Sequence, residues 1–366
     1  FMLVFVREVI QFAPVLRFNP QMNEMNRDLN VLVLTDHRNH TEHNSIYALC
    51  TALRRQQGIA QVHVASRGNT NNHAFFYRYE QGPIRAWALD GEMQFRQAAY
   101  RFGQETVPAD LNDYDWIWLR LPPPIPDGFF DFLRAVYPEE RIINRPSGIE
   151  ATSTKAFITQ LPKWAPDTRL CRNFSEVEAM QAEYPIVLKP LHSYGGHGIV
   201  KVAGGQVTDA GRAYPLHRYR RELETGFARG GYLGMRFLKN VSQGDKRTIV
   251  INGRILGSVL RMPLPGAWLC NAAQGGQAVI ARPDQRERQM ARELSDMLTP
   301  MGILMFGMDT LVNDEQQRVL SEVNTLSIGG IQPMETRSGK PIADRAAQQI
   351  ARYLAAHSTA PLPAVF

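Results

Sequence analysis

Residues 185–202 read PIVLKPLHSYGGHGIVKV, and this stretch is the most informative part of the chain. An apolar run ends at Lys189, a glycine-rich loop follows, and a second apolar run returns, which predicts two antiparallel strands joined by a flexible loop. Gly195, Gly196 and Gly198 have no Cβ, so their backbone N–H groups can approach an anion closely. Lys189 adds a compact positive charge. The stretch therefore predicts a nucleotide-phosphate loop, although an ordinary glycine hairpin has the same pattern.

A second predicted hairpin lies near the C-terminus, where residues 307–312 and 318–324 are rich in β-forming side chains and flank a polar turn. Asp309 lies on the first strand of this hairpin. Glu322 and Asn324 are two residues apart on the second strand, so they share one face of the sheet. Oxygen ligands of this kind suit Mg²⁺, which is commonly held by one or two carboxylates together with nucleotide phosphates. A solvated surface hairpin is the alternative interpretation of these three residues taken alone.

Together, the two hairpins and the blocks between them resemble the ATP-grasp superfamily and, within it, the prokaryotic glutathione synthetases. The resemblance extends from about residue 29 to residue 357 and keeps the order and spacing of the family's blocks. Six blocks carry it: DWIWLRLPPP at 115–124, IINRP at 142–146 with ATSTK at 151–155, GDKR at 244–247, RMP at 261–263, NAAQGG at 271–276 and EVN at 322–324. Each block is weakly specific alone, but six in the same order are strongly specific.

The resemblance implies an ATP-grasp fold of mixed α/β and α+β character, in which ATP lies between two antiparallel sheets. Independently, an expected strand at 30–35, helix at 45–57 and strand at 60–65 begin a doubly wound, pre-ATP-grasp domain. We expect four regions: an extension of unknown role (1–28), the N-terminal substrate domain (29–145), an ATP-grasp small subdomain with the glycine flap (146–230), and a large subdomain with the lid and the metal hairpin (231–366).

The chemistry that the resemblance implies is activation of a carboxylate by ATP, giving an acyl phosphate that an amine attacks. Such phosphoryl transfer depends mostly on positioning and charge neutralisation. The expected ATP-binding residues are Lys155, Lys189, Gly195, Gly196, Gly198, Met235, Arg236 and Phe237. The expected ligands of Mg²⁺, with Mn²⁺ as an alternative ion, are Asp309, Glu322 and Asn324. The acyl phosphate would be neutralised by Arg247 and Arg261. The expected substrate-binding residues are Arg120, Asn271, Ser327, Gly329 and Gly330.

Glutathione synthesis from γ-glutamylcysteine and glycine is the function that the resemblance favours. A related ligase joining another carboxylate to an amino acid or peptide stays open, as does a non-catalytic nucleotide-binding protein. The alternatives remain because the chain departs from the family pattern. Leu269 and Gln277 replace lid arginines, Met235 replaces a hinge glutamine, and residues 325–330 read TLSIGG where the family has TSPT.

The composition of the chain limits the other classes of protein that need to be considered. The 366 residues carry a net charge of +6, but the basic residues are scattered, so we expect small-molecule carboxylate and amine substrates rather than nucleic acid. No apolar run approaches the roughly 18 residues that span a bilayer. The three separated cysteines form neither a metal pattern nor an even disulfide set, which favours a reducing cytoplasm; Cys270 is not expected to be a nucleophile.

His37, His40 and His43 predict a solvated or substrate-facing loop, with a metal site as the alternative. A homo-oligomer is also expected.

Overall fold

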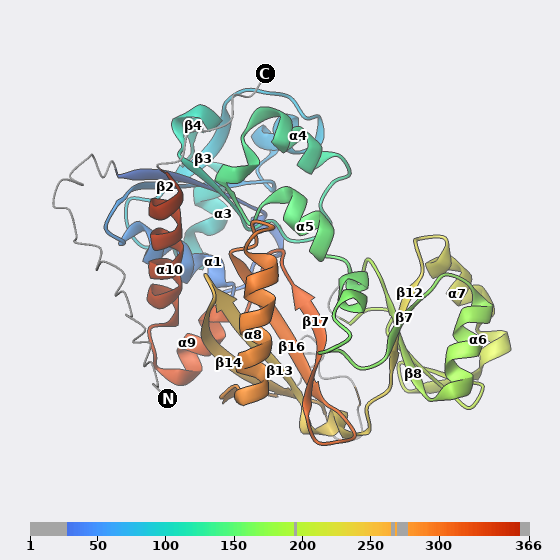
Figure 1. Ribbon diagram of the computed structural model, residues 1–366. Coiled ribbons are helices and arrows are strands. Elements are labelled where there is room, and N and C mark those ends of the chain that lie inside the picture. The colour runs from blue at the N-terminus through green and yellow to red at the C-terminus, as the bar shows by residue number, and fades with distance from the viewer. Residues whose placement is uncertain (1–27, 194–195, 265–267, 269–276, 359–366) are drawn as a thin grey trace, which may run out of the picture.

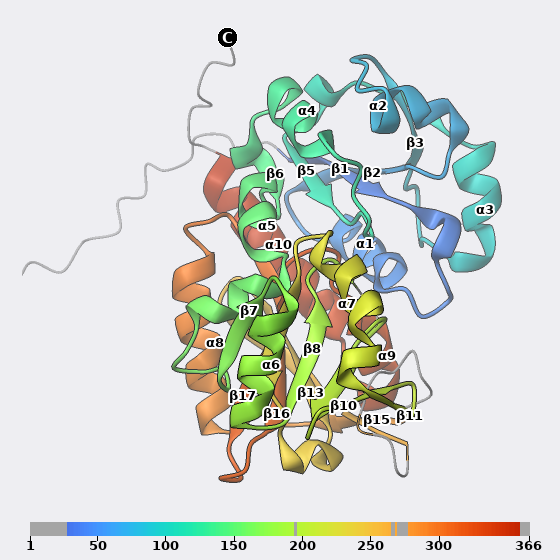
Figure 2. The ribbon, with the colours of Figure 1, turned by 90° about the vertical axis from the view of Figure 1, so that its right-hand side faces the viewer.

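The computed structural model describes residues 28–193, 196–264, 268 and 277–358. The strands of this part of the chain form three sheets (Figure 1). One sheet belongs to the N-terminal domain, and the other two face each other in the second half of the molecule (Figure 2). This arrangement agrees with the expected ATP-grasp fold and its additional N-terminal domain.

The first sheet has the strand order β4-β3-β2-β1-β5-β6. Its members are β1 (Leu29–Thr35), β2 (Ile59–Ser66), β3 (Ile84–Ala88), β4 (Val107–Ala109), β5 (Trp116–Leu119) and β6 (Ile142–Ile143). The four strands β2, β1, β5 and β6 run parallel, as expected of a doubly wound domain. The strands β3 and β4 add an antiparallel edge that the sequence analysis did not predict.

Helices cover both faces of this first sheet. The helix α1 (Ser45–Arg54) begins at Asn44, whose side chain accepts a hydrogen bond from the backbone N–H of Ile46. Buried side chains of α1, α3 (Phe95–Gly103) and α10 (Ile342–Ser358) pack on one face. The other face is covered by α2 (His73–Tyr77), α4 (Phe129–Val136) and α5 (Pro146–Thr152). The C-terminal helix α10 therefore returns to the N-terminal domain.

The second sheet is antiparallel, with the order β11-β10-β9-β8-β12-β7. Its members are β7 (Thr168–Cys171), β8 (Ile186–Pro190), β9 (Val200–Ala203), β10 (Gln206–Asp209), β11 (Arg212–Pro215) and β12 (Tyr232–Arg236). The predicted strand pair around the glycine loop is confirmed as β8 and β9. Apolar residues of α6 (Phe174–Glu183) and α7 (Arg220–Phe227) pack on this sheet. Because β12 pairs with β7 and β8, we propose that the small subdomain extends to Arg236 rather than to residue 230.

The third sheet is also antiparallel, with the order β15-β14-β13-β16-β17. Its members are β13 (Asp245–Ile251), β14 (Arg254–Met262), β15 (Gln277–Ala281), β16 (Met305–Val312) and β17 (Arg318–Asn324). The predicted hairpin with Asp309 and Glu322 is confirmed as β16 and β17. The helix α8 (Gln285–Leu298) packs on one face, and α9 (Ile331–Ser338) joins α10 on the other. Among the described residues, the helices are too short or too polar to span a membrane.

Candidate active site

A buried cluster of four charged residues lies on the third sheet. The strand register places Arg247 directly opposite Asp309 and Asp245 directly opposite Arg261. Arg247 donates from Nε to Oδ1 of Asp309 at 2.8 Å and from Nη2 to Oδ2 at 2.5 Å. Nη2 of Arg261 lies 2.9 Å from Oδ2 of Asp309 and also donates to Asp245. Two arginines and two carboxylates thus alternate on one sheet face.

Burial and the charges within this cluster shift the pKa values of its two carboxyl groups in opposite directions. Burial alone would raise the pKa of Asp309, but the charges of Arg247 and Arg261 outweigh burial and hold it well below its usual range. The pKa of Asp245 is raised to about 6 by burial and by the negative charge of Asp309. Asp309 is therefore the carboxylate that remains ionised throughout the neutral range, as a metal ligand must.

The three predicted metal ligands lie together on the sheet. Glu322 is the register partner of Asp309 across β16 and β17, and Nδ2 of Asn324 donates to Oδ2 of Asp309 at 3.3 Å. This donor set of hard oxygens fits a divalent ion such as Mg²⁺, which keeps water and phosphate ligands besides one or two carboxylates. The described residues contain no group of three or more His, Cys, Asp and Glu side chains arranged around a metal position. A divalent ion here would take its remaining ligands from water and nucleotide phosphates.

A β-bulge beside Asp309 was not predicted. The register shifts between Asp309 and Thr310, so Ser321 is an extra residue on β17. The carbonyl of Ser321 accepts a hydrogen bond from Nζ of Lys189 at 3.1 Å, and its hydroxyl donates to the Asp309 carbonyl at 3.1 Å. The bulge thereby connects the flap strand β8 of the second sheet to the metal hairpin of the third.

The two predicted phosphate-binding lysines converge on Glu322 from different elements. Lys155 opens a short 3₁₀ segment (Lys155–Gln160) and donates to the carbonyl of Ser193 beside the flap. Burial lowers the pKa of both Lys155 and Lys189, while the charge of Glu322 acts in the opposite direction. A narrow pocket beside them is lined by Ser153, Thr154, Lys155, Phe157, Ile158, Ser321, Glu322 and Val323. Two ammonium groups next to a carboxylate can bind phosphate oxygens and a divalent ion together.

The two flap glycines that the structure describes have the conformation that a glycine loop requires. Gly196 has φ +80° and Gly198 has φ +71°, a region that other residues rarely adopt. A Cβ on Gly198 would lie 3.1 Å from Cγ of Pro190, so a side chain there would press on the end of β8. The predicted phosphate-binding residue Gly195 lies outside the described residues.

The expected adenine-contacting segment is at the end of β12. Met235 is buried, whereas Arg236 is exposed and lies 3.7 Å from the carboxylate of Asp314. The ring of Phe237 is contacted by Nζ of Lys201, 3.8 Å from its centroid, and by the indole of Trp268. Phe237 therefore offers a partly exposed aromatic ring, whereas Met235 belongs to the hydrophobic core and the side chain of Arg236 is engaged at the surface.

The expected substrate residues surround the junction with the N-terminal domain. Arg120 is buried, donates from Nη2 to the carbonyl of Ile328 at 2.7 Å, and accepts at its own carbonyl from the hydroxyl of Ser327. Burial lowers the pKa of Arg120 to about 10. Gly329 and Gly330 follow at once, and Gly330 precedes α9 with φ +106°. The predicted residue Asn271 lies outside the described residues, as does Cys270.

Sequence reasoning missed the role of Asn144. Its Nδ2 donates to the carbonyls of Met305 and Thr325, both at 2.6 Å, and its Oδ1 accepts from the N–H of Met305 at 3.0 Å. One buried amide thus connects the N-terminal domain to the start of β16 and to the loop after β17. Asn144 lies in the IINRP block, so its place in that block could have indicated that it has a role. Nothing in the sequence indicated the partners of its side chain.

The three histidines after β1 do not share one partner. Nδ1 of His37 lies 2.6 Å from the hydroxyl of Ser66, and His40 lies between the hydroxyls of Thr35 and Tyr47. His43 is exposed. Burial, and to a lesser degree the neighbouring His37 and Arg120, lower the pKa of His40 to about 4, so it is neutral at physiological pH. The sequence predicts a loop here, and the structure has a short 3₁₀ segment at His37–Asn39.

Comparison with known families agrees with this geometry. Residues 154–339, just over half of the chain, match the family described as prokaryotic glutathione synthetase, ATP-grasp domain. The chain belongs to this family. A glutathione synthetase of Prochlorococcus marinus (strain MIT 9313) is 33% identical over 249 residues, covering 67% of this chain and 76% of the relative. A glutathione synthetase of Nitrosomonas europaea is 30% identical over 258 residues, covering 68% and 76%.

Solved structures support the same fold. The D-cycloserine synthetase DcsG superposes with a TM-score of 0.61 at 15% identity, covering 89% of this chain and 99% of that one. The macrocyclase MdnC from Microcystis aeruginosa MRC, solved with its precursor peptide, gives a TM-score of 0.55 at 14% identity, covering 88% and 100%. The family match and the relatives named glutathione synthetase show that the protein is an ATP-dependent ligase of the glutathione synthetase type, and the non-catalytic alternative is not supported.

Proposed function

We propose that this protein is a glutathione synthetase, which joins γ-glutamylcysteine to glycine and converts ATP to ADP and phosphate. One observation carries the proposal: the charged groups predicted for phosphate and metal binding lie together. Lys155 and Lys189 lie beside Glu322. Glu322 is the register partner of Asp309, which is contacted by Arg247, Arg261 and the side-chain amide of Asn324. The family membership and relatives named glutathione synthetase support this substrate pair over others.

The proposed roles follow from charge and position. Lys155 and Lys189 bind ATP phosphate oxygens, and the backbone N–H groups of the flap glycines cover them. Asp309, Glu322 and Asn324 would hold a divalent ion, with Mg²⁺ the proposed metal, and when bound it neutralises phosphate charge. Met235 and Phe237 are the proposed contacts of the adenine ring, and Arg236 lies between them in the same segment.

Arg247 and Arg261 are placed to stabilise the acyl phosphate. Both guanidinium groups already contact Asp309, so their charge is held beside the proposed metal position without being free to move away. Phosphoryl transfer to the substrate carboxylate gains from such preorganised charge. The amine of glycine then attacks the acyl carbon, and phosphate leaves. Arg120, Asn271, Ser327, Gly329 and Gly330 are the proposed substrate contacts.

A second candidate is a ligase that joins another acid to an amino acid or peptide. The replacements at Leu269 and Gln277 favour it, because they remove lid arginines that suit substrates rich in carboxylates. Structural neighbours of low identity include a D-cycloserine synthetase and ATP-grasp ligases solved with peptides, so this fold accommodates other substrates.

Product analysis separates the two candidates. Purified protein is incubated with ATP, magnesium and γ-glutamylcysteine, with and without glycine, and glutathione is measured by mass spectrometry. The proposal predicts glutathione and ADP in equal amounts, and a higher rate in Leu269→Arg. Absence of glutathione in both the unmodified protein and Leu269→Arg, with turnover of another acid, would establish the second candidate.

A further inference from the structure

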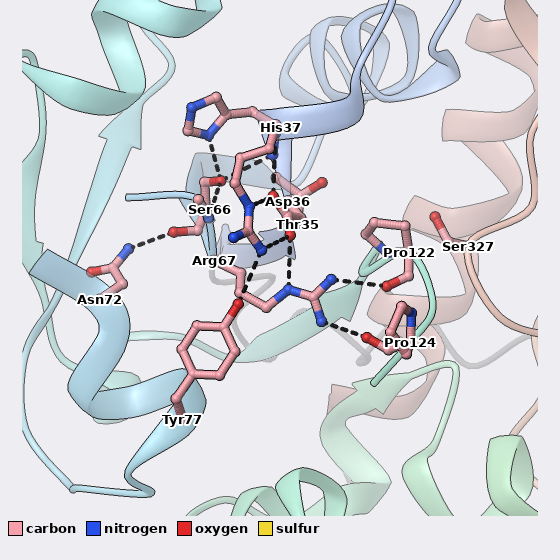
Figure 3. A network of polar contacts seen from close by, with 12 residues as sticks. Thr35, Asp36, His37, Ser66, Arg67, Asn72, Tyr77, Pro122, Pro124 and Ser327 are labelled. Atoms are coloured by element: carbon pink, nitrogen blue, oxygen red, sulfur yellow. Dashed lines mark hydrogen bonds and ion pairs between the residues drawn. The ribbon is translucent and has the colours of Figure 1, made fainter. Parts of the chain in front are cut away.

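A polar network at the carboxyl ends of β1, β2 and β5 is not used by the mechanism above. We call it the strand-end network; it comprises Thr35, Asp36, Arg38, Ser66, Arg67 and Tyr77, and it reaches the backbone of Pro122 and Pro124 (Figure 3). In open sheets of this kind, ligands bind outside the carboxyl ends of the parallel strands. The strands β2 and β5 lie on opposite sides of β1, so the network occupies the point where the strand order reverses.

The inner part of the network is structural. Arg67 is buried and uses three nitrogens: Nε donates to Asp36 at 2.8 Å, Nη1 to the carbonyl of Pro124 at 2.8 Å, and Nη2 to that of Pro122 at 3.1 Å. Figure 3 shows Arg67 between Asp36 and the two prolines. Through these bonds Arg67 fixes the proline segment that follows Arg120. Its charge is buried and paired with Asp36, so it is not exposed to solvent.

The outer part differs, because it presents donors to solvent. Arg38 donates from Nε to Oδ1 of Asp36 at 2.9 Å and from Nη2 to Oδ2 at 2.6 Å, yet its side chain is 49% exposed. Nη2 also donates to the hydroxyl oxygen of Tyr77 at 3.0 Å, and Tyr77 is 42% exposed. Since that oxygen accepts from Arg38, its own proton is available to a further acceptor.

The local charge and backbone favour an anion at this position. Arg38 and Arg67 share the single carboxylate of Asp36, so the network has one excess positive charge. A Cβ on Gly68 would lie 2.8 Å from Cγ of Arg38, so glycine is needed for Arg38 to lie against this loop. The bonds to Asp36 use Nε and Nη2, which leaves the Nη1 edge of a fixed guanidinium for a carboxylate.

We propose that Arg38 and Tyr77 bind the carboxylate at the end of the acid substrate remote from the carboxylate that is activated. This inference rests on the proposed function, since it extends the same substrate site. The occupant is a substrate carboxylate rather than an ATP phosphate, because Lys155 and Lys189 lie at the other two sheets. The network shares its sheet edge with Arg120, whose carbonyl accepts from Ser327 of the expected substrate loop. In γ-glutamylcysteine, the remote carboxylate is the α-carboxylate of the glutamyl residue.

The test compares Arg38→Ala with the matched control Arg78→Ala. Arg78 also lies near the end of α2 but is exposed and paired with the exposed Glu80. Calorimetry measures the binding of γ-glutamylcysteine and of the same dipeptide with its glutamyl α-carboxylate amidated. The wild-type protein should bind the acid at least about tenfold more tightly than the amide, because a charge-assisted hydrogen bond is lost. Arg38→Ala should remove this preference, Tyr77→Phe should reduce it, and Arg78→Ala should retain it.

The outcomes distinguish this inference from the proposed function. Equal loss of acid binding in Arg38→Ala and Arg78→Ala, or equal binding of acid and amide by the wild type, would overturn the anion site. Arg38-dependent acid binding without glutathione formation would support the anion site and reject the proposed function. Glutathione formation with an unchanged KM for γ-glutamylcysteine in Arg38→Ala would support the proposed function and reject the anion site. Unfolding midpoints should be alike in both alanine variants, because Arg67 keeps Asp36 paired.

Discussion

Arg247 forms a two-point ion pair with Asp309, from Nε to Oδ1 at 2.8 Å and from Nη2 to Oδ2 at 2.5 Å. The pair joins a residue of the GDKR block on β13 to the proposed metal hairpin on β16. Successive residues of a strand point to opposite faces. Lys246, the neighbour of Arg247, therefore lies on the other side of the sheet, where it donates to Glu287 of α8 at 2.6 Å. One motif thus combines a site residue with a structural one.

The first prediction distinguishes the structural role of Lys246 from the proposed catalytic role of Arg247. Lys246→Met should lower the free energy of unfolding by about 3–5 kcal/mol, because it leaves the fully buried Glu287 without its counter-ion. The folded fraction should keep its turnover. Arg247→Lys keeps the charge but loses the two-point geometry, so it should lower turnover by about 10²-fold with little loss of stability.

Urea unfolding and phosphate release measure the two quantities. The double variant Lys246→Met/Glu287→Gln should recover part of the lost stability, because the unpaired charge is removed. Equal catalytic loss in Lys246→Met and Arg247→Lys would show that the two residues do not have separate roles.

The second prediction concerns the metal hairpin. Glu322→Gln should preserve folding, since it exchanges one isosteric group on a partly exposed strand position. Turnover should fall by about 10²-fold or more, because a charged oxygen ligand is lost. Phosphate release is measured over a series of magnesium concentrations, with Glu315→Gln in the exposed turn as the control. Normal turnover in Glu322→Gln would remove Glu322 from the metal site.

The third prediction concerns the flap. Gly198→Ala should raise the KM for ATP about 5- to 30-fold, because a left-handed backbone costs an alanine roughly 1–2 kcal/mol and the new Cβ meets Pro190. Gly211→Ala is the matched control, since Gly211 has φ +82° in the β10–β11 turn and nothing within 4 Å of its Cβ position. If both variants raise the KM equally, the flap does not contact the nucleotide specifically.

The fourth prediction concerns pH and His40. Its pKa is lowered to about 4 in the folded state, so between pH 6.5 and 4 the unfolded chain binds a proton that the folded chain does not. Stability should therefore decrease as the pH falls through this range, by up to about 3 kcal/mol from this residue. The pKa of His37 is also lowered by burial and acts in the same direction.

Thermal unfolding at a series of pH values measures this effect. His40→Gln should make the decrease in stability between pH 6.5 and 4 shallower, while the exposed His43→Gln should leave it unchanged. An unaltered pH dependence in His40→Gln would show that folding does not lower the pKa of His40.

Local patterns in the sequence predicted the two hairpins because the relevant signals are local. Three glycines after Lys189 and the alternation of Glu322 and Asn324 depend only on strand periodicity and backbone freedom. The bulge at Ser321 could not be predicted, since it appears only when β17 is paired with β16. The same holds for Asn144, whose partners Met305 and Thr325 are 161 and 181 residues away in sequence.

The return of the C-terminal helix was missed for a similar reason. The apolar face of α10 predicts burial but does not indicate that α1 is its neighbour. The antiparallel edge of β3 and β4 likewise depends on tertiary pairing. Arg120 was predicted as a substrate residue from its block, but its burial against Ile328 was visible only in the structure.

In the proposed reaction, the chain activates the cysteinyl carboxylate of γ-glutamylcysteine by phosphorylation before glycine attacks. The most direct test uses γ-glutamylcysteine with ¹⁸O in its cysteinyl carboxylate, ATP, magnesium and glycine. Mass spectrometry measures the isotope content of the released phosphate. Each released phosphate should contain one ¹⁸O atom, with one glutathione and one ADP formed per phosphate. Unlabelled phosphate, or the formation of AMP and pyrophosphate, would contradict the proposed reaction.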